Sequence, residues 1–375
     1  MSSKLVLVSG GLGFIGTHLC RELARSGHTV RVLDNLDPQV HGPNPIVQEG
    51  MSLVRGDVRD ASAWRNALED AEVVFHEAAA VGIGQSMYEV RRYVEVNALG
   101  TANLLDYLVN EEHEVKRVLL ASSMSIYGEG RYKCPACGVV ESERCESDLR
   151  ESAWEPKCPV CQRELRSLPT DEGKPLRPRS IYAITKRDQE EMCMQIGKAY
   201  GISTVALRYF NVYGPGQSLS NPYTGVCAIF SSRVKAGKPP LIYEDGKQTR
   251  DFVNVKDVVA ANILAMKRRS MVQGCFNVGT GTPTSILDVA ETILGIYNSD
   301  LKPMITGQYR AGDIRHCYAD ISSIRSQGFK PRFSLEAGMR ELSEWARSQE
   351  AKDRFESAAQ ELAKRGLITG RRTGA

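Results

Sequence analysis

The chain has 375 residues, of which 42% are hydrophobic and 25% charged, and this globular composition excludes a disordered or fibrous protein. The net charge is only +3, so neither nucleic acid nor a membrane is expected as a partner, and a small molecule is favoured. No apolar run reaches the roughly 20 residues that span a bilayer, and the N-terminus enters a strand rather than a signal peptide. We therefore expect a cytoplasmic protein.

The first residues predict a dinucleotide-binding site. The apolar run 4–9 (KLVLVS) is typical of a buried parallel strand, and the glycine-rich turn 10–16 leads into a helix that ends near Gly27. Glycines in such a turn let the backbone approach a pyrophosphate, whose charge is met by free N–H groups at the start of the helix. The predicted cofactor-binding residues here are Gly10, Gly13, Phe14, Ile15 and Gly16.

The next strand, 29–34 (TVRVLD), indicates which dinucleotide binds. A carboxylate at Asp34 can accept hydrogen bonds from the adenosine ribose and would repel a 2′-phosphate. The residues that follow, Asn35, Leu36 and Asp37, offer such a phosphate no cation. NAD is therefore predicted as the cofactor rather than NADP, with Asp34 and Asn35 among its contacts.

Strands and helices continue to alternate along the chain. Strands are predicted in 52–58, 71–79 and 115–123, with helices near 61–68 and 96–109. This alternation predicts an α/β fold with a Rossmann-type doubly wound parallel sheet. We expect an NAD-binding domain over 1–220, a smaller substrate-binding lobe mixed with the same sheet over 221–345, and a charged helical tail over 346–375 that frays.

A tyrosine and a lysine with catalytic spacing follow. Tyr182 and Lys186 are four residues apart, so in a helix they lie on one face. A neighbouring cation lowers the pKa of a phenol from about 10 toward the range in which it can act as a base. Upstream, the segment ASSMSIYG ends a predicted parallel strand and places Ser122, Ser123 and Ser125 where open α/β sheets bind ligands.

Together these motifs resemble the extended short-chain dehydrogenase/reductase family, and within it the NAD-dependent nucleotide-sugar epimerases and dehydratases. The resemblance covers residues 4–345 apart from one insertion, and includes GDVRD, HEAAA, RYFNVYGP, DGKQTRDFV and RAGDIRH. It implies that Tyr182 takes a proton from a sugar hydroxyl, that Ser123 hydrogen-bonds the reacting oxygen, and that Lys186 holds the nicotinamide ribose. Further implied cofactor contacts are Asp57, Val58, Ala78, Ala79 and Asn97, besides Tyr182 and Lys186.

The residues after Ser123 favour epimerisation. Dehydratases of this family carry acidic residues there, whereas this chain has Met124 and Ser125, which do no acid or base chemistry. Oxidation and reduction at one carbon remain, and these suffice for a 4-epimerase with a transient 4-keto sugar. Alternatives are a related reductase or an epimerase acting at another carbon. A further alternative is an NAD-sensing binding protein, in which we would expect one of the three catalytic residues to be replaced, but Ser123, Tyr182 and Lys186 are all present.

The resemblance also implies a nucleoside-diphosphate sugar as substrate. Arg250 and Arg310 match two arginines that bind the diphosphate, a task that suits the forked guanidinium group. Asn211 and Ser125 would add polar contacts. Segments 34–42, 81–89 and 220–226 resemble a subgroup that includes dTDP-L-rhamnose 4-epimerases, and a 6-deoxy sugar would fit a pocket lined by Val81, Met124 and Tyr213. A homodimer is usual for the family.

An insertion over 131–168 separates the serine strand from the tyrosine helix. It contains two C-x2-C pairs separated by twenty residues, a spacing that predicts a zinc ribbon. The predicted ligands of a structural zinc ion are Cys134, Cys137, Cys158 and Cys161. The alternatives are four reduced thiols in a loop or two disulfides, the latter disfavoured by a reducing cytoplasm.

The role of this insertion stays open between a lid, a subunit contact and a scaffold. Its seven basic and seven acidic residues leave it without the basic excess that nucleic acid needs. Cys145 is a spare thiol. The other five cysteines are expected to be small buried side chains: Cys20, Cys193, Cys227, Cys275 and Cys317.

Overall fold

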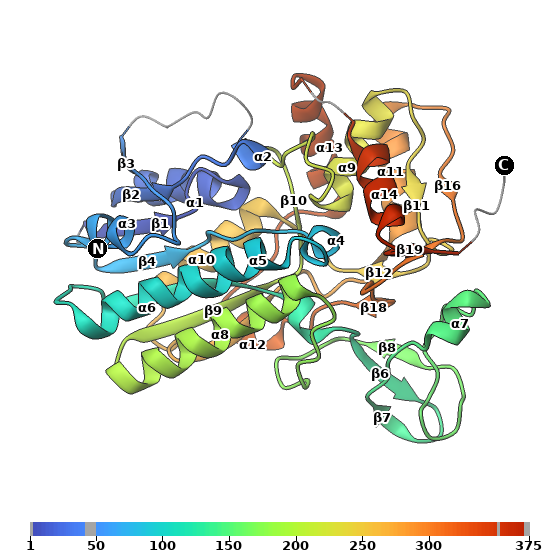
Figure 1. Ribbon diagram of the computed structural model, residues 1–375, viewed down its shortest axis with the longest axis horizontal. Coiled ribbons are helices and arrows are strands. Elements are labelled where there is room, and N and C mark those ends of the chain that lie inside the picture. The colour runs from blue at the N-terminus through green and yellow to red at the C-terminus, as the bar shows by residue number, and fades with distance from the viewer. Residues whose placement is uncertain (1–2, 42–49, 351–352, 371–375) are drawn as a thin grey trace.

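The computed structural model describes residues 3–41, 50–350 and 353–370 and is centred on a parallel sheet of seven strands in the order β14-β9-β5-β4-β1-β2-β3 (Figure 1). The chain builds β1 to β3 outward in one direction and β4, β5, β9 and β14 in the other. The predicted doubly wound sheet is confirmed. The strands are β1 (Leu5–Ser9), β2 (Thr29–Asp34), β3 (Met51–Arg55), β4 (Val73–His76), β5 (Arg117–Ser123), β9 (Ser203–Tyr209) and β14 (Gly274–Val278).

Helices cover both faces of this sheet, which is why its central strands are buried and mostly apolar. On one face Leu19 and Val258 pack into the same core as Val6, and on the other Trp64 and Leu104 pack with Leu7. The first face carries α1 (Phe14–Arg25), α10 (Val255–Lys267) and α12 (Ser322–Ser326), and the second carries α3 (Ala61–Leu68), α6 (Gly100–Asn110) and α8 (Ile181–Tyr200). Residues 255–278 follow the start of the predicted substrate lobe in sequence, but they contribute α10 and β14 to the main sheet and its covering layer.

Short helices lead from the sheet to the ligand-binding edge. They are α2 (Pro38–His41), α4 (Ile83–Ser86), α5 (Val90–Tyr93), the π-helix η1 (Val94–Leu99) and the 3-10 helix η2 (Met124–Tyr127).

The substrate lobe has a core of its own, built by α9 (Val226–Lys235), α11 (Ile286–Tyr297) and α13 (Leu335–Arg347). Tyr213 belongs to this core with 1% of its surface exposed, so the prediction that it lines the sugar pocket is wrong. Small sheets also form in this region. In them β10 (Asn211–Tyr213) pairs with β13 (Phe252–Asn254), β11 (Leu241–Ile242) pairs with β16 (Met304–Ile305), and β12 (Thr249–Arg250) pairs with β15 (Thr284–Ser285) and β18 (His316–Cys317).

The C-terminal segment packs on this lobe. Its helix α14 (Phe355–Lys364) buries Phe355, Ala358 and Leu362, and its strand β19 (Ile368–Thr369) pairs antiparallel with β17 (Tyr309–Arg310). We expected a helical tail that frays; within 353–370 the chain forms a helix and a strand that pack on the lobe. The apolar side chains of α14 recur on one face of the helix and are buried, although the segment contains many charged residues. Residues 371–375 lie outside the described part.

The insertion forms a small unit beside the main sheet, at the lower right of Figure 1. A three-stranded antiparallel sheet in the order β7-β6-β8 carries one short helix. These elements are β6 (Arg131–Cys134), β7 (Gly138–Val140), α7 (Glu146–Arg150) and β8 (Arg166–Leu168).

Candidate active site

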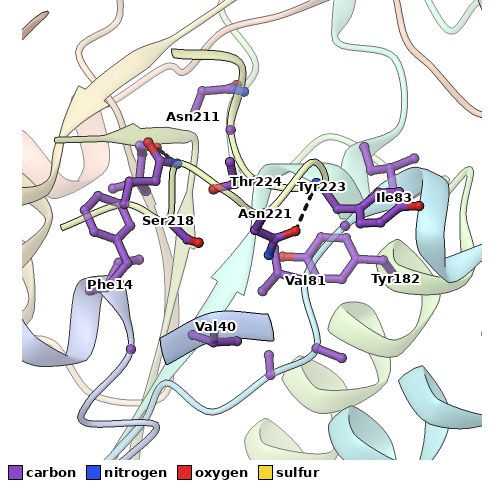
Figure 2. Close-up of a pocket in the computed structure, with 18 of the residues that line it drawn as sticks. Phe14, Val40, Val81, Ile83, Tyr182, Asn211, Ser218, Asn221, Tyr223 and Thr224 are labelled. Carbon is purple, nitrogen blue, oxygen red and sulfur yellow. Dashed lines mark hydrogen bonds between the residues drawn. The ribbon is translucent and has the colours of Figure 1, made fainter. Parts of the chain in front are cut away.

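A cavity of about 980 Å³ lies at the carboxyl ends of the sheet strands, where the direction of winding reverses between β1 and β4. Gly10 follows β1, Ala78 follows β4 and Ser123 ends β5, and all three line it. Figure 2 shows Phe14 and Tyr182 on the sheet side of this cavity, with Asn221 and Tyr223 contributed by the substrate lobe. The cavity therefore joins the predicted cofactor site to the predicted substrate site.

The glycine turn is shaped for a close backbone approach. Gly10 has a φ of +69°, and a Cβ on Gly16 would lie 2.2 Å from the carbonyl oxygen of Gly10, so side chains are excluded at both positions. Helix α1 starts after Gly13 without a side-chain cap, which leaves its first N–H groups open toward the cavity. The five predicted contacts of this turn, Gly10, Gly13, Phe14, Ile15 and Gly16, all line the cavity.

Asp34 ends β2 at the cavity wall. Its carboxylate accepts hydrogen bonds from the backbone N–H groups of Leu12 and Leu36, at 3.1 and 2.9 Å, and its Oδ1 lies 3.1 Å from Nε2 of His41. Burial opposes ionisation, but these partners outweigh it and lower the Asp34 pKa. Sequence analysis missed His41, since it considered only the three residues directly after Asp34.

Most other predicted cofactor contacts lie where expected, and two do not. Asn35, Val58, Ala78 and Ala79 line the cavity. Asp57 is not part of the cavity wall; it is partly exposed, accepts from Asn35 Nδ2 at 2.8 Å and pairs with Arg59.

Asn97 is fully buried behind the cavity wall rather than in it. Its amide accepts from the N–H of Ala80 at 2.7 Å and donates to the Ala80 carbonyl and to Thr185 on α8. The structure therefore shows Asn97 connecting the loop after β4 to the helix that carries Tyr182.

The three predicted catalytic side chains meet at the end of β5. Helix α8 begins after Ser180, whose side chain caps it by accepting from Ala183 N–H, and this start places Tyr182 in the first turn. Tyr182 hydrogen-bonds Ser123, and Ser125 Oγ in turn donates to Ser123 Oγ at 2.9 Å. Lys186 is buried one turn further on and donates from Nζ to the Ala121 carbonyl at 2.8 Å.

The electrostatics of this group differ from the prediction. We expected Lys186 to lower the pKa of Tyr182, but burial raises it, and only the hydrogen bond to Ser123 acts in the other direction. Burial also lowers the pKa of Lys186 to about 8, and the nearby Glu77 opposes that change.

Glu77 is a cavity residue to which sequence analysis assigned no role. Its Oε1 accepts from the Tyr209 hydroxyl at 2.8 Å, and burial raises its pKa to about 7. The sequence feature that could have identified Glu77 is its position, because it is an acidic residue directly after the buried strand β4.

The predicted substrate contacts also line the cavity, with Ser125 beside Ser123 and the two arginines contributed by the substrate lobe. Ser125, Asn211, Arg250 and Arg310 are all part of its wall, and the buried Oδ1 of Asn211 has no partner among the described residues. Arg250 donates to the carbonyls of Thr249, Ile314 and Arg315, whereas Arg310 donates from Nε to Asp313 at 2.8 Å. Val81 and Met124, predicted to line the sugar pocket, do line the cavity.

The C-terminal helix closes the substrate side, which sequence analysis did not foresee. Its apolar face contributes Phe355, Ala358, Ala359 and Leu362 to the cavity wall.

The four cysteines of the insertion also come together. The Sγ atoms of Cys134, Cys137, Cys158 and Cys161 all lie within 4.8 Å of one another. Cys145 is exposed and outside this cluster, and of the other five cysteines all but the half-buried Cys275 are buried.

A profile of the NAD dependent epimerase/dehydratase family matches residues 6–149 and 160–279. The chain belongs to this family. It is 39% identical over 354 residues to dTDP-L-rhamnose 4-epimerase of Burkholderia thailandensis, with 92% of this chain and 95% of that protein covered. The unmatched residues 150–159 lie inside the cysteine insertion.

Solved structures agree with this family. UDP-glucose 4-epimerase of Thermotoga maritima with UDP-glucose is similar at a TM-score of 0.76 and 29% identity, covering 92% of this chain and 98% of that one. UDP-glucose 4-epimerase of Thermus thermophilus with NAD is similar at a TM-score of 0.73 and 30% identity, covering 92% and 100%. The predicted resemblance to NAD-dependent nucleotide-sugar epimerases is confirmed. In the described part of the chain, we find no helix with the length and apolar character needed to cross a bilayer.

Proposed function

We propose that the protein catalyses the NAD-dependent 4-epimerisation of a nucleoside-diphosphate hexose, a dTDP- or UDP-sugar, through a transient 4-keto sugar. The observation that carries this proposal is one cavity lined by an NAD-type glycine turn, by Ser123, Tyr182 and Lys186, and by two arginines opposite them. The relative from Burkholderia thailandensis supports a dTDP-L-rhamnose type of substrate.

The residues present fit NAD. The uncapped start of α1 and the space that only glycine leaves at Gly16 suit a pyrophosphate, while Asp34 suits an adenosine ribose. When bound, NAD supplies the hydride acceptor and donor. The protein itself orients the sugar, excludes water and moves a proton.

Tyr182 is the group that takes the proton from the sugar C4 hydroxyl as the hydride leaves C4, and it returns that proton when the hydride comes back to the other face. Ser123 hydrogen-bonds Tyr182 and is placed to bind the same oxygen, which favours the phenolate. Met124 offers no proton to a leaving group, so elimination of water has no carrier there.

The test is incubation of the purified protein with UDP-, dTDP- and GDP-sugars without added NAD. Interconversion of a pair of 4-epimers is the expected result. Net NADH formation with an oxidised sugar, once NAD is supplied, would instead indicate a dehydrogenase, and epimers at another carbon would indicate the related epimerase.

We also propose a structural zinc ion on Cys134, Cys137, Cys158 and Cys161. Four thiols within 4.8 Å of one another suit tetrahedral thiolate coordination, and a unit of this size has little core of its own. Because such thiols must stay reduced, this supports a cytoplasmic location. Elemental analysis of the purified protein should find one zinc per chain, and its absence after expression with zinc would refute the site.

A homodimer is proposed as the state in solution. Val90, Val94, Leu99 and Ile184 are exposed apolar side chains on α5, η1 and α8, which lie together on one side of the sheet. Sedimentation equilibrium should give twice the chain mass, and Ile184→Asp should shift the protein toward monomers. A monomeric wild-type protein would contradict the proposal.

A further inference from the structure

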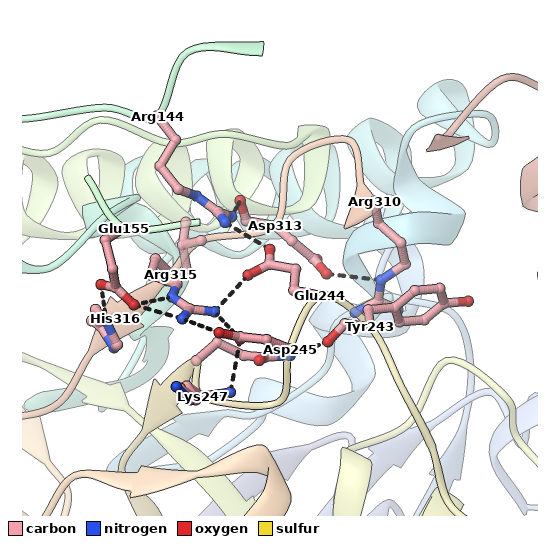
Figure 3. A network of polar contacts seen from close by, with 12 residues as sticks. Arg144, Glu155, Tyr243, Glu244, Asp245, Lys247, Arg310, Asp313, Arg315 and His316 are labelled. Atoms are coloured by element: carbon pink, nitrogen blue, oxygen red, sulfur yellow. Dashed lines mark hydrogen bonds and ion pairs between the residues drawn. The ribbon is translucent and has the colours of Figure 1, made fainter. Parts of the chain in front are cut away.

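The cysteine insertion contacts the substrate lobe through a network of charged side chains outside the catalytic group (Figure 3). Arg144 of the insertion reaches Glu129 at 3.1 Å and Glu244 at 2.7 Å. Glu155, also of the insertion, reaches Arg315 at 2.6 Å and His316 at 3.0 Å. The network therefore joins three parts of the chain that lie far apart in sequence.

The central members of this network are removed from water. The side chains of Arg144, Glu129 and Glu244 are 4%, 5% and 3% exposed, and that of Arg315 is fully buried. A buried charge is unfavourable unless it is paired, so each of these groups depends on its partners. Removing one of them leaves the other charged and poorly compensated.

Glu244 connects the network to the cavity. It lines the cavity wall, and its carboxylate is paired with Arg144 on one oxygen and with Arg315, at 2.9 Å, on the other. An unpaired carboxylate in this wall would repel a diphosphate. Arg144 thus helps to keep the electrostatic environment of this wall suitable for an anion.

The same arginine fixes the loop that holds the two predicted diphosphate ligands. Arg144 Nη2 donates to the carbonyl of Asp313 at 2.8 Å, and the Asp313 carboxylate accepts from Arg310. Arg250 donates to the carbonyls of Ile314 and Arg315 in the same loop, at 2.6 and 2.9 Å. None of residues 131–168, all of which the structure describes, lines the cavity. The insertion therefore acts on the cavity from behind, which argues against a lid.

We infer that the insertion tunes substrate binding: Arg144 is a positioning residue that neutralises Glu244 and fixes residues 310–316, so that Arg250 and Arg310 can bind the substrate diphosphate. Glu155 supports the same loop through Arg315. The inference rests on the proposed nucleoside-diphosphate-sugar substrate.

The test is Arg144→Met, with kcat and KM for the nucleotide sugar and the Kd of whichever of UDP, dTDP and GDP the wild type binds, measured by calorimetry. KM and this Kd should each rise about tenfold, while kcat should stay within about twofold because the catalytic side chains lie on other elements. Arg166→Met is the matched control, since Arg166 is exposed on the same insertion. It should leave both constants unchanged.

Rescue separates this role from a merely structural one. Glu244→Gln in the Arg144→Met background removes the charge of the cavity-wall carboxylate that has lost one of its two arginine partners, and it should restore most of the nucleoside-diphosphate affinity, whereas a general loss of packing would become worse. Arg144→Lys should be intermediate, because it keeps a cation without the forked contacts. If Arg144→Met does not fold, Glu155→Gln replaces it as the test variant, because Glu155 is half-exposed at the rim of the network. The same Kd should then rise about threefold.

A folded Arg144→Met protein with wild-type KM and Kd would overturn the inference, and so would an equal rise in Arg166→Met. The proposed function can be refuted independently of this inference. If no 4-epimer pair is interconverted although nucleoside diphosphate binds and Arg144→Met weakens that binding, the inference stands and the reaction assignment does not.

Discussion

The two sides of the cavity are built in different ways. On the sheet side, Ser123, Tyr182 and Lys186 come from β5 and α8, which pack directly on each other, and their hydrogen bonds stay within this pair and the adjoining η2. On the substrate side, Arg250 and Arg310 depend on the loop 310–316. That loop is held by the insertion through ion pairs and by the C-terminal segment through strand pairing.

This difference separates chemistry from binding. The proposed reacting groups lie on the parallel sheet and its helix α8, inside the region that matches the family profile, whereas the proposed binding groups are supported by the insertion, which interrupts that match at 150–159, and by the C-terminal segment, which lies beyond it. We therefore expect substitutions on the sheet side to change kcat, and those on the substrate side to change KM.

The largest effect is expected for Tyr182→Phe. Loss of the proton acceptor should lower kcat about a thousandfold, with little change in KM or bound NAD. Tyr93→Phe is a matched control, because its ring packs edge-on against Tyr182 with centroids 6.4 Å apart and only its own hydroxyl is lost. Steady-state kinetics that leave kcat within about tenfold of wild type would remove Tyr182 from the chemistry.

Truncation after Gln349 should have the next largest effect. It removes α14 from the cavity wall and β19 from the strand that carries Arg310, so KM should rise about a hundredfold while bound NAD is retained. Removal of residues 371–375 alone is the control and should change little. Loss of NAD on truncation at Gln349 would show that the two sides are not independent.

A smaller change is expected for the double substitution Cys134→Ser and Cys158→Ser. If the four cysteines hold zinc, this protein should lose the metal and show a rise in KM of about tenfold, comparable to that of Arg144→Met, with a smaller effect on kcat. Cys145→Ser is the control because Cys145 lies outside the cluster. Full metal retention in the double variant would refute the site.

The sheet side could be predicted from the sequence because short segments determine it. The glycine turn from Gly10 to Gly16, Asp34 at the end of its strand, and the four-residue step from Tyr182 to Lys186 each depend on local backbone geometry. Even here, the pKa of Tyr182 could not be read from spacing, because burial of the phenol outweighs the influence of its neighbours.

The substrate side could be predicted only in part. The cysteine spacing gave the cluster, but the pair between Arg144 and Glu244 joins residues that no local pattern relates. The apolar face of α14, with Phe355, Ala358 and Leu362, was present in the sequence and was obscured by the charged residues around it. His41 is a comparable case, because the short helix α2 brings it to Asp34.

Ser123→Ala should give a smaller effect than these at the optimum pH, together with a distinctive pH profile. Tyr182 must be deprotonated to accept the sugar proton, and the hydrogen bond from Ser123 lowers its pKa against the effect of burial. Without that bond the pKa rises further, so the acidic limb of the kcat profile should move to higher pH. The rate should fall several-fold at neutral pH and recover in alkaline buffer.

Ser125→Ala should shift that limb in the same direction but less, because Ser125 reaches Tyr182 only indirectly, by donating to Ser123 Oγ. Arg144→Met, by contrast, should raise KM and leave the position of the limb unchanged, since it contacts none of the three catalytic side chains. An acidic limb that stays in place in Ser123→Ala would mean that another group controls the ionisation of Tyr182. Glu77, whose pKa is raised to about 7 by burial although Lys186 opposes that change, would then be the residue to substitute next on the sheet side.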